Sequence, residues 1–293
     1  MQNRRDFIKK ASLLIAGGAI APQLITSCGG GAPKKYLGLQ LYSLREMVKD
    51  DGIKKVLETV AAMGYTNLEP AGYSDGKIYG LAPAEIKKIC EDLGMKLTSS
   101  HLNRSRTDDH DADMAWWSKA VDAHNEAGMK YMVMPVTPVP IYDEHATLDN
   151  VKLYADYFNE IGLIVAAASM NFGYHNHNME FISKIDGKPV YDYMVENTSP
   201  DHVSFQLDVY WIKKGGCDPV DYMKKYPKRI KTLHIKDETA IGAQNTVDYK
   251  AVFEQAYANG IKDWFVEVER YDGTPQEDVK KSAEYLLKAD FVK

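Results

Sequence analysis

The sequence predicts a (β/α)8 barrel, in which eight parallel strands form a closed barrel inside a layer of helices. Short runs rich in β-branched and aromatic residues recur eight times with helical patterns between them, which indicates parallel strands with covering helices. Setting aside the first 28 of 293 residues leaves 265, and about 250 residues is typical of such a barrel. The expected strands are Leu37–Tyr42, Tyr65–Glu69, Lys96–His101, Tyr131–Met134, Asn171–His175, Val203–Asp208, Ile230–Ile235 and Trp264–Val268.

The segments between these strands have the spacing of amphipathic helices. Ile53, Val56, Leu57 and Val60 are three or four residues apart, and Gly64 follows where a C-terminal cap is expected. Further helices are expected from Pro83 to Gly94 and over Ala112–Gly128, Leu148–Ser169, Asp248–Gly260 and Pro275–Lys288. An open, doubly wound sheet is the competing architecture. It is disfavoured because no Gly-x-Gly-x-x-Gly motif follows the first strand and because polar residues follow most strands.

The first 28 residues have the pattern of an export signal. Arg4 and Arg5 precede an apolar run over Ala11–Ile25, and the pair resembles a twin-arginine motif. The run ends in a lipobox-like sequence whose Cys28 would carry the lipid, although an ordinary cleaved signal is the alternative. We therefore expect export to the cell envelope or periplasm with a lipid anchor at Cys28. A flexible tether over residues 29–35 and a single barrel over residues 36–293 would follow.

The composition is that of an ordinary soluble globular protein, with 45% hydrophobic residues, 26% charged residues and a net charge of −5. Binding to nucleic acid requires clustered positive charge, which this balance does not favour. Cys90 lies in an apolar helical stripe and is expected to be buried. The chain could form an oligomer, since nothing in the sequence decides its assembly state.

Polar residues collect where the expected strands end, and in a barrel these ends meet at one mouth. These residues are Gln40, Tyr42, Glu69, His101, His175, His177, Glu180, Asp208, Trp211, His234, Lys236, Asp237, Glu267 and Glu269. Converging imidazoles and carboxylates need a cation or protons to compensate them, so a divalent metal is the economical explanation. A structural polar network is the alternative. Gln40, Tyr42, Glu69 and Trp211 are our candidates for binding the substrate.

Three stretches together resemble the sugar phosphate isomerase/epimerase family of xylose-isomerase-like barrels, within the superfamily of AP endonuclease family 2. They are Tyr174–Phe181, Leu207–Trp211 with the following Gly215–Pro219, and His234–Asp237; Val266–Glu269 fits as well. The likeness runs from about residue 36 to the end, and the export signal makes the chain an exported, lipoprotein-type member. It implies a carbohydrate enzyme but no single reaction, because the family contains isomerases, epimerases, dehydratases and lyases.

The resemblance also implies a site for one divalent metal ion. Asp208, His234 and Glu267 match three of the family's ligands. Many relatives have Glu at the end of the fifth strand, where this chain has His175, so either His175 or Glu180 from the following loop is the fourth ligand, and we favour Glu180. A mixed set of oxygen and imidazole ligands suits Mn²⁺, Mg²⁺, Co²⁺ or Zn²⁺.

Two further positions, Glu269 and Trp211, lie close to this expected ligand set in the sequence. Glu269 points the same way as Glu267 along a strand, so it is a substitute ligand or a base beside the metal. Trp211 stands where many relatives have a histidine, and because an indole cannot bind the metal we expect it to pack against a sugar or the core.

The expected reaction is isomerisation or epimerisation of a sugar or keto-sugar. The metal would polarise a carbonyl and stabilise an enediolate, while His177, His101 or Glu269 moves the proton. Lys236 would hold an oxyanion or hydroxyl, or would form a surface ion pair with Asp237. Export and the lack of a glycine-rich phosphate loop favour an unphosphorylated substrate.

Three other functions remain open at this stage. A keto-glycoside lyase or hydrolase would use the same scaffold. A non-catalytic, sugar-binding envelope protein is possible because a fold does not determine a function. The superfamily's metal-dependent nucleases for abasic DNA are disfavoured by the negative net charge and the export signal.

Overall fold

Parallel strands form the centre of the molecule. The computed structural model describes residues 35–138 and 140–293; the expected signal, Cys28 and all of the expected tether except Lys35 lie outside the described residues. Nine strands lie in one sheet in the order β5-β2-β1-β13-β12-β11-β8-β7-β6. They are β1 (Gly38–Gln40), β2 (Asn67–Glu69), β5 (Lys96–Leu97), β6 (Ser99–His101), β7 (Tyr131–Met134), β8 (Asn171–His175), β11 (Val203–Asp208), β12 (Ile230–Lys236) and β13 (Asp263–Glu267).

The two ends of this sheet are halves of one strand that is interrupted at Thr98. β5 pairs with β2, and β6 pairs with β7. The Thr98 N–H donates to the carbonyl of Leu68, and the Lys130 N–H donates to the carbonyl of Thr98. The first and last strands also pair, with Leu39 opposite Val266. The sheet is therefore closed, and the predicted (β/α)8 barrel is confirmed.

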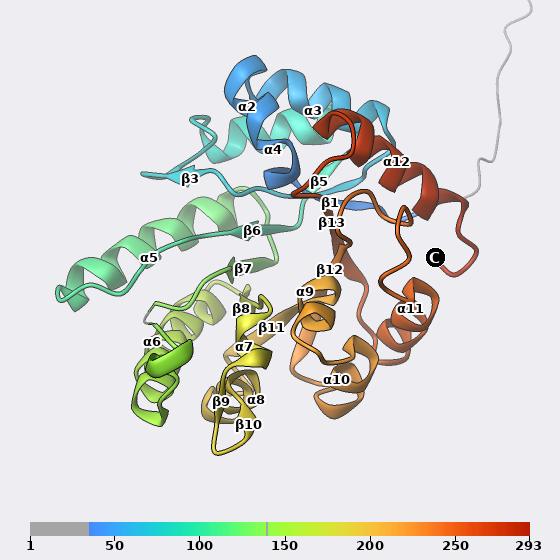
Figure 1. Cartoon of the computed structure of the whole chain (residues 1–293). Coiled ribbons are helices and arrows are strands. Elements are labelled where there is room, and N and C mark those ends of the chain that lie inside the picture. The colour runs from blue at the N-terminus through green and yellow to red at the C-terminus, as the bar shows by residue number, and fades with distance from the viewer. Residues whose placement is uncertain (1–34, 139) are drawn as a thin grey trace, which may run out of the picture. The chain divides into compact units, whose positions relative to one another are not determined.

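Helices surround the strands in chain order, as the colour sequence in Figure 1 shows. They are α2 (Arg45–Asp51), α3 (Ile53–Ala62), α4 (Pro83–Asp92), α5 (His110–Glu126), α6 (Leu148–Ala167), α7 (Met179–Ile182), α8 (Val190–Asn197), α9 (Val209–Lys214), α10 (Pro219–Lys225), α11 (Tyr249–Ala258) and α12 (Pro275–Lys288). None of the helices in the described ranges is long and apolar enough to cross a membrane.

Short elements occupy several loops between strands and helices. They are the 3-10 helices η1 (Leu41–Leu44) and η2 (Asp143–His145) and two hairpins, β3 (Tyr73–Ser74) with β4 (Lys77–Ile78) and β9 (Lys184–Ile185) with β10 (Lys188–Pro189). The helices carry the apolar stripes that the sequence predicts: Ile53, Val56, Leu57 and Val60 are the buried residues of α3. Cys90 is completely buried on α4, as expected.

The two-residue period of each strand divides apolar from polar side chains. On β12, Leu233 and Ile235 belong to the hydrophobic core, whereas His234 between them reaches across the barrel to Glu69 on β2. β12 continues one residue beyond the expected strand, so Lys236 has the same orientation as His234. The barrel thereby carries chemically active side chains on its inner side while its outer side packs against the helices.

Candidate active site

Four potential metal ligands lie at the ends of four neighbouring strands, β8, β11, β12 and β13. His175, Asp208, His234 and Glu267 each offer a ligand atom, and all four atoms lie within 4.8 Å of one another. His234 Nδ1 is 3.1 Å from Glu267 Oε2 and 4.0 Å from Asp208 Oδ2, and His175 Nε2 is 3.9 Å from Asp208 Oδ2. Each side chain is buried, so solvent cannot screen the group.

Asp208 has one satisfied and one unsatisfied oxygen. Its Oδ1 caps α9 by accepting the backbone N–H groups of Tyr210 (2.9 Å) and Trp211 (2.7 Å). Its Oδ2 is buried without a hydrogen-bond partner. Burial raises the pKa of Asp208 to about 7, against the lowering effect of Lys236. A fixed, buried carboxylate oxygen without a donor is what a cation site requires.

His234 lies between two carboxylates. Its Nε2 is 2.5 Å from Glu69 Oε1, opposite the nitrogen that faces Glu267. Burial opposes a charge on this ring, but Glu69 and Glu267 outweigh burial and raise the pKa of His234 to about 10. Without a metal, the imidazole therefore carries a proton on each nitrogen. A divalent ion would replace the proton on Nδ1.

Lys236 supplies a buried positive charge beside the four ligands. Its Nζ is 2.9 Å from Glu267 Oε2 and 2.5 Å from Glu269 Oε2, and it lies 5.4 Å from the centre of the Trp211 ring. Burial opposes its charge, but Glu267, Asp208 and Glu269 raise the pKa of Lys236 above the ordinary value. The structure places Lys236 against these two glutamates, whereas Asp237 accepts the Tyr249 hydroxyl.

A layer of buried polar side chains lies behind the ligands. Glu69 accepts hydrogen bonds from Gln40 Nε2 and Gln206 Nε2, both at 2.8 Å, besides its contact with His234. Gln206 Oε1 is 2.7 Å from His101 Nε2 and 3.1 Å from His175 Nδ1.

Gln40 and Glu69 are not placed as we expected of substrate-binding residues. Both are completely buried, neither lines the cavity, and their polar atoms are occupied by other side chains or, for Gln40 Oε1, by the backbone of Tyr42. Their orientation into the barrel follows the expected alternation.

Glu180, the fourth ligand that we favoured, lies outside the ligand group. Its carboxylate accepts the hydroxyls of Tyr174 (2.5 Å) and Tyr142 (3.2 Å) and the backbone N–H of His177 (3.0 Å). Tyr174 precedes His175 on β8 and so faces the opposite side of the strand. Glu180 is thus held by other donors, whereas His175 is a member of the four-residue group.

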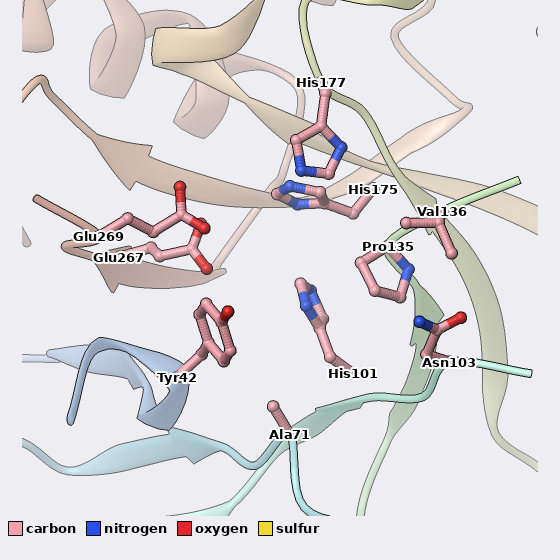
Figure 2. A pocket seen from close by; sticks show the side chains of 10 residues that line it. All are labelled: Tyr42, Ala71, His101, Asn103, Pro135, Val136, His175, His177, Glu267 and Glu269. Carbon is pink, nitrogen blue, oxygen red and sulfur yellow. The ribbon is translucent and has the colours of Figure 1, made fainter. Parts of the chain in front are cut away.

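A cavity of about 330 Å³ opens at the mouth beside these groups (Figure 2). It is lined by Tyr42, Ala71, His101, Asn103, Pro135, Val136, His175, His177, Glu267 and Glu269. Of the residues expected to act on substrate, Tyr42, His101, His177 and Glu269 therefore reach the cavity. Trp211 does not line it and packs against His177 and Lys236 instead.

Asn103 and Gln206 are polar site residues that the sequence analysis did not single out. Asn103 follows the third strand by two residues and lines the cavity. Gln206 has the same parity as Asp208 on β11, and that parity was the available signal for its orientation into the barrel.

The donor set fits a divalent metal. The four ligand atoms come from two imidazoles and two carboxylates, the types that suit Zn²⁺, Mn²⁺ and Co²⁺, and the unpartnered Oδ2 of Asp208 lies among them. His101 forms a second candidate group with His175 and His234, and its ring stacks on that of His234 at 4.9 Å.

The family model described as a xylose isomerase-like TIM barrel matches residues 57–289. The chain belongs to this family. It is 38% identical to a solved structure from Parabacteroides distasonis ATCC 8503, named a sugar phosphate isomerase/epimerase, with a TM-score of 0.81 over 88% of this chain and 100% of that one.

Two further proteins are similar to this chain. An inosose dehydratase of Geobacillus thermodenitrificans is 27% identical over 175 residues, which span 51% of this chain and 56% of that protein. A protein of this fold solved with a bound zinc atom is 16% identical, with a TM-score of 0.65 over 85% of this chain and 95% of that one. The relatives of this chain are enzymes that modify small carbohydrates.

Proposed function

We propose that this barrel is a metal-dependent isomerase or epimerase that moves a proton beside the carbonyl of an unphosphorylated sugar or keto-sugar. The observation that carries the proposal is the juxtaposition of a four-ligand group with imidazoles that line the same cavity. His175, Asp208, His234 and Glu267 would hold the ion. When bound, a divalent ion supplies electrophilic polarisation of a carbonyl oxygen. The zinc in a protein of the same fold supports a divalent ion here, without choosing among zinc, manganese, cobalt and magnesium.

His101 is suited to accept a proton from the substrate. Burial lowers the pKa of His101 despite the opposing charge of Glu69, so the ring is neutral. Its Nε2–H donates to Gln206, which leaves the lone pair on Nδ1 as the proton acceptor. His177 lines the cavity on the other side of His175, as Figure 2 shows. His101 and His177 thus line the cavity on either side of His175. Two separate imidazoles suit epimerisation, in which one group removes a proton from the substrate and another returns a proton to the opposite face of the same carbon.

Glu269, held by Lys236 behind it, completes the polar side of the cavity. The Glu269 carboxylate lines it and is paired with Lys236, so it serves as a third proton acceptor or as a hydrogen-bond acceptor for sugar hydroxyls. Tyr42 lies at the entrance with 43% of its surface exposed, and the Arg45 guanidinium is 4.6 Å from the centre of its ring. A tyrosine ring held in this way offers a platform for the apolar face of a sugar.

The cavity lining favours a neutral substrate. None of its ten residues is Arg or Lys, and the buried ammonium of Lys236 is already paired with two carboxylates. A phosphate group normally requires Arg, Lys or a set of backbone N–H donors. We therefore propose an unphosphorylated sugar, although the name of the Parabacteroides relative includes a sugar phosphate.

Turnover in D2O with a panel of keto-sugars and keto-glycosides tests the reaction. Deuterium should enter at the carbon beside the carbonyl, and incorporation should require the metal. His101→Asn or His177→Asn should slow it by about 10²–10⁴-fold, the usual contribution of a positioned acid or base. His145→Asn, which changes an exposed histidine on η2, is the matched control and should leave the rate unchanged.

Other outcomes of this experiment discriminate between the alternatives. Product that keeps its original hydrogen would indicate a hydride shift or a shielded base. Loss of water or of the glycosidic group would point to the lyase or hydrolase alternative, which the dehydratase relatives favour. Tight binding of sugars without turnover would indicate an envelope sugar-binding protein.

We also propose that the protein is exported and held in the cell envelope by a lipid on Cys28. The twin-arginine pattern and the lipobox-like sequence support this proposal. Cys28→Ala should release the protein from the membrane fraction and leave its activity intact. A wild-type protein that is already fully soluble in the periplasm would contradict the lipid anchor.

A further inference from the structure

A histidine can bind a metal only if its proton is on the nitrogen that faces away from the ion. For His175, the nitrogen that faces Asp208 is Nε2, at 3.9 Å from the carboxylate oxygen. For Nε2 to bind a metal, Nδ1 of His175 would have to carry the proton, and a buried N–H requires an acceptor. This acceptor is Gln206, whose Oε1 is 3.1 Å from His175 Nδ1.

The orientation of the Gln206 amide follows from its other contact. The opposite end of this amide lies 2.8 Å from Glu69 Oε2, and a carboxylate needs a donor there, so the NH2 group must face Glu69. Gln206 Oε1 is then turned toward both His175 and His101, whose Nε2 is at 2.7 Å. The three side chains around Gln206 are buried, as Gln206 is, so water does not offer substitute partners.

We propose that Gln206 is a positioning residue that fixes the tautomers of His175 and His101. Its single amide oxygen holds the proton of His175 on Nδ1 and, with Glu69 Oε1 at 3.3 Å as a second acceptor, the proton of His101 on Nε2. The first leaves Nε2 of His175 free for the metal, and the second leaves Nδ1 of His101 free to accept a proton. Glu69 sets this arrangement by orienting the amide. The consequences for metal binding and proton transfer rest on the proposed function, whereas the tautomers themselves do not.

The tautomer of His175 can be measured in the metal-free protein. A long-range ¹H–¹⁵N correlation spectrum distinguishes a proton on Nδ1 from one on Nε2, and comparison with the spectrum of His175→Gln assigns the signals. The expected result is a neutral ring protonated on Nδ1. A proton on Nε2, or two equally populated tautomers, would overturn the proposal. This measurement uses the wild-type chain, so it decides the tautomer even if a variant fails to fold.

The effect on metal binding is measured with Gln206→Leu and with Gln206→Met, which keeps most of the shape but has no amide. In both variants we expect the tautomer preference to be lost and the zinc dissociation constant, measured by competition with a chromophoric chelator, to rise about 10–100-fold, as for other residues that orient metal ligands. Gln255→Leu is the matched control. Gln255 lies on α11, donates to Asn259 and is outside the ligand group, so this substitution should not change zinc affinity.

The outcomes separate the two proposals. Unchanged zinc affinity in both Gln206 variants would overturn the positioning role. A wild-type protein with the expected tautomer that binds no zinc, manganese, cobalt or magnesium would overturn the proposed function, while the role of Gln206 in fixing the tautomer would stand.

Discussion

Glu180 and Asp208 are both completely buried carboxylates at or just beyond the ends of the neighbouring strands β8 and β11, yet their surroundings differ. Glu180 at the start of α7 receives three hydrogen-bond donors, two from tyrosine hydroxyls and one from the backbone. Asp208 at the start of α9 uses one oxygen to cap its helix, and the other has no partner. The two carboxylates are therefore equally buried, but only Glu180 has hydrogen-bond donors for both of its oxygens.

This difference teaches how to separate a structural carboxylate from a ligand. A buried anion must be compensated, either by hydrogen-bond donors or by a cation. Glu180 is compensated within the protein, whereas Asp208 Oδ2 faces the imidazoles of His175 and His234. The unsatisfied atom, and not the residue type or its place near a strand end, is the reason for proposing Asp208 as the ligand.

The largest expected effect is on metal content. Asp208→Asn replaces the unpartnered oxygen by a neutral amide atom, so we expect at least about a hundredfold weaker metal binding, more than the effect of orienting residues. Elemental analysis after dialysis measures it. Asp218→Asn is the matched control, because Asp218 caps α10 through two backbone N–H groups in the same way but is not in the ligand group. Full metal occupancy in Asp208→Asn would contradict the proposal that Asp208, unlike Glu180, is a metal ligand.

The second prediction concerns the pH dependence of metal affinity. Burial raises the pKa of Asp208 to about 7, and two carboxylates raise the pKa of His234 to about 10. The metal must displace the His234 proton at neutral pH and, below pH 7, the Asp208 proton too. As the pH is lowered, affinity should fall about tenfold per unit from about pH 10 to pH 7 and should approach about a hundredfold per unit well below pH 7. Titration with zinc at several pH values measures the slope, and a slope that does not steepen would contradict the assignment of Asp208.

His124 on α5 sharpens the comparison, because its Nε2 is also buried without a partner. Among residues 35–138 and 140–293, His124 belongs to no group of potential metal ligands, so we expect it to bind no metal. Burial lowers the pKa of His124 to about 4, against an unfolded value of about 6.5. Below pH 6.5 the unfolded chain binds a proton that the folded chain does not. The contribution of His124 to the free energy of unfolding is therefore fully present above pH 6.5. It decreases by about 3 kcal/mol as the pH is lowered from 6.5 to 4.

Urea unfolding of the metal-free protein at pH 7 and pH 4.5 measures this loss. His124→Leu should lose less stability than the wild type between the two pH values, because leucine takes up no proton in either state. An equal loss in both proteins would show that His124 is not the group responsible.

The smallest effect is expected at the satisfied carboxylate. Glu180→Gln leaves at least one of the three donors without an acceptor and should lower the free energy of unfolding by about 1–3 kcal/mol. Its metal content should not change, in contrast to Asp208→Asn. Glu196→Gln, in an exposed pair with Lys188, is the control and should stay within about 0.5 kcal/mol of the wild type. Metal loss in Glu180→Gln would restore Glu180 as a ligand.

The sequence predicted the barrel because hydrophobic periodicity and strand parity are local properties. The same parity oriented Asp208, His234 and Glu267 into the barrel. Strand parity did not decide whether His175 or Glu180 is the fourth candidate ligand, because Glu180 lies beyond the end of β8, where the alternation of side chains no longer applies. The contact with Tyr174 that holds Glu180 depends on how the turn folds back.

Depth was the second property that the sequence did not reveal. Gln40 and Glu69 have the expected orientation, but their position behind His234 follows from the closure of the barrel, which brings β2 and β12 within reach of each other. Gln206 was missed for a related reason. An amide within a strand has no feature that distinguishes it until its partners on other strands are known.

Lys236 gives the mouth of the barrel a positive charge that dialysis cannot remove. Whether or not a metal ion is bound, Glu267 and Glu269 have this cation between them. Stripping the metal therefore does not expose two bare, mutually repelling anions, and the folded chain should survive chelation. One preparation can then be emptied and refilled with different metals, so that their effects are compared in the same folded protein.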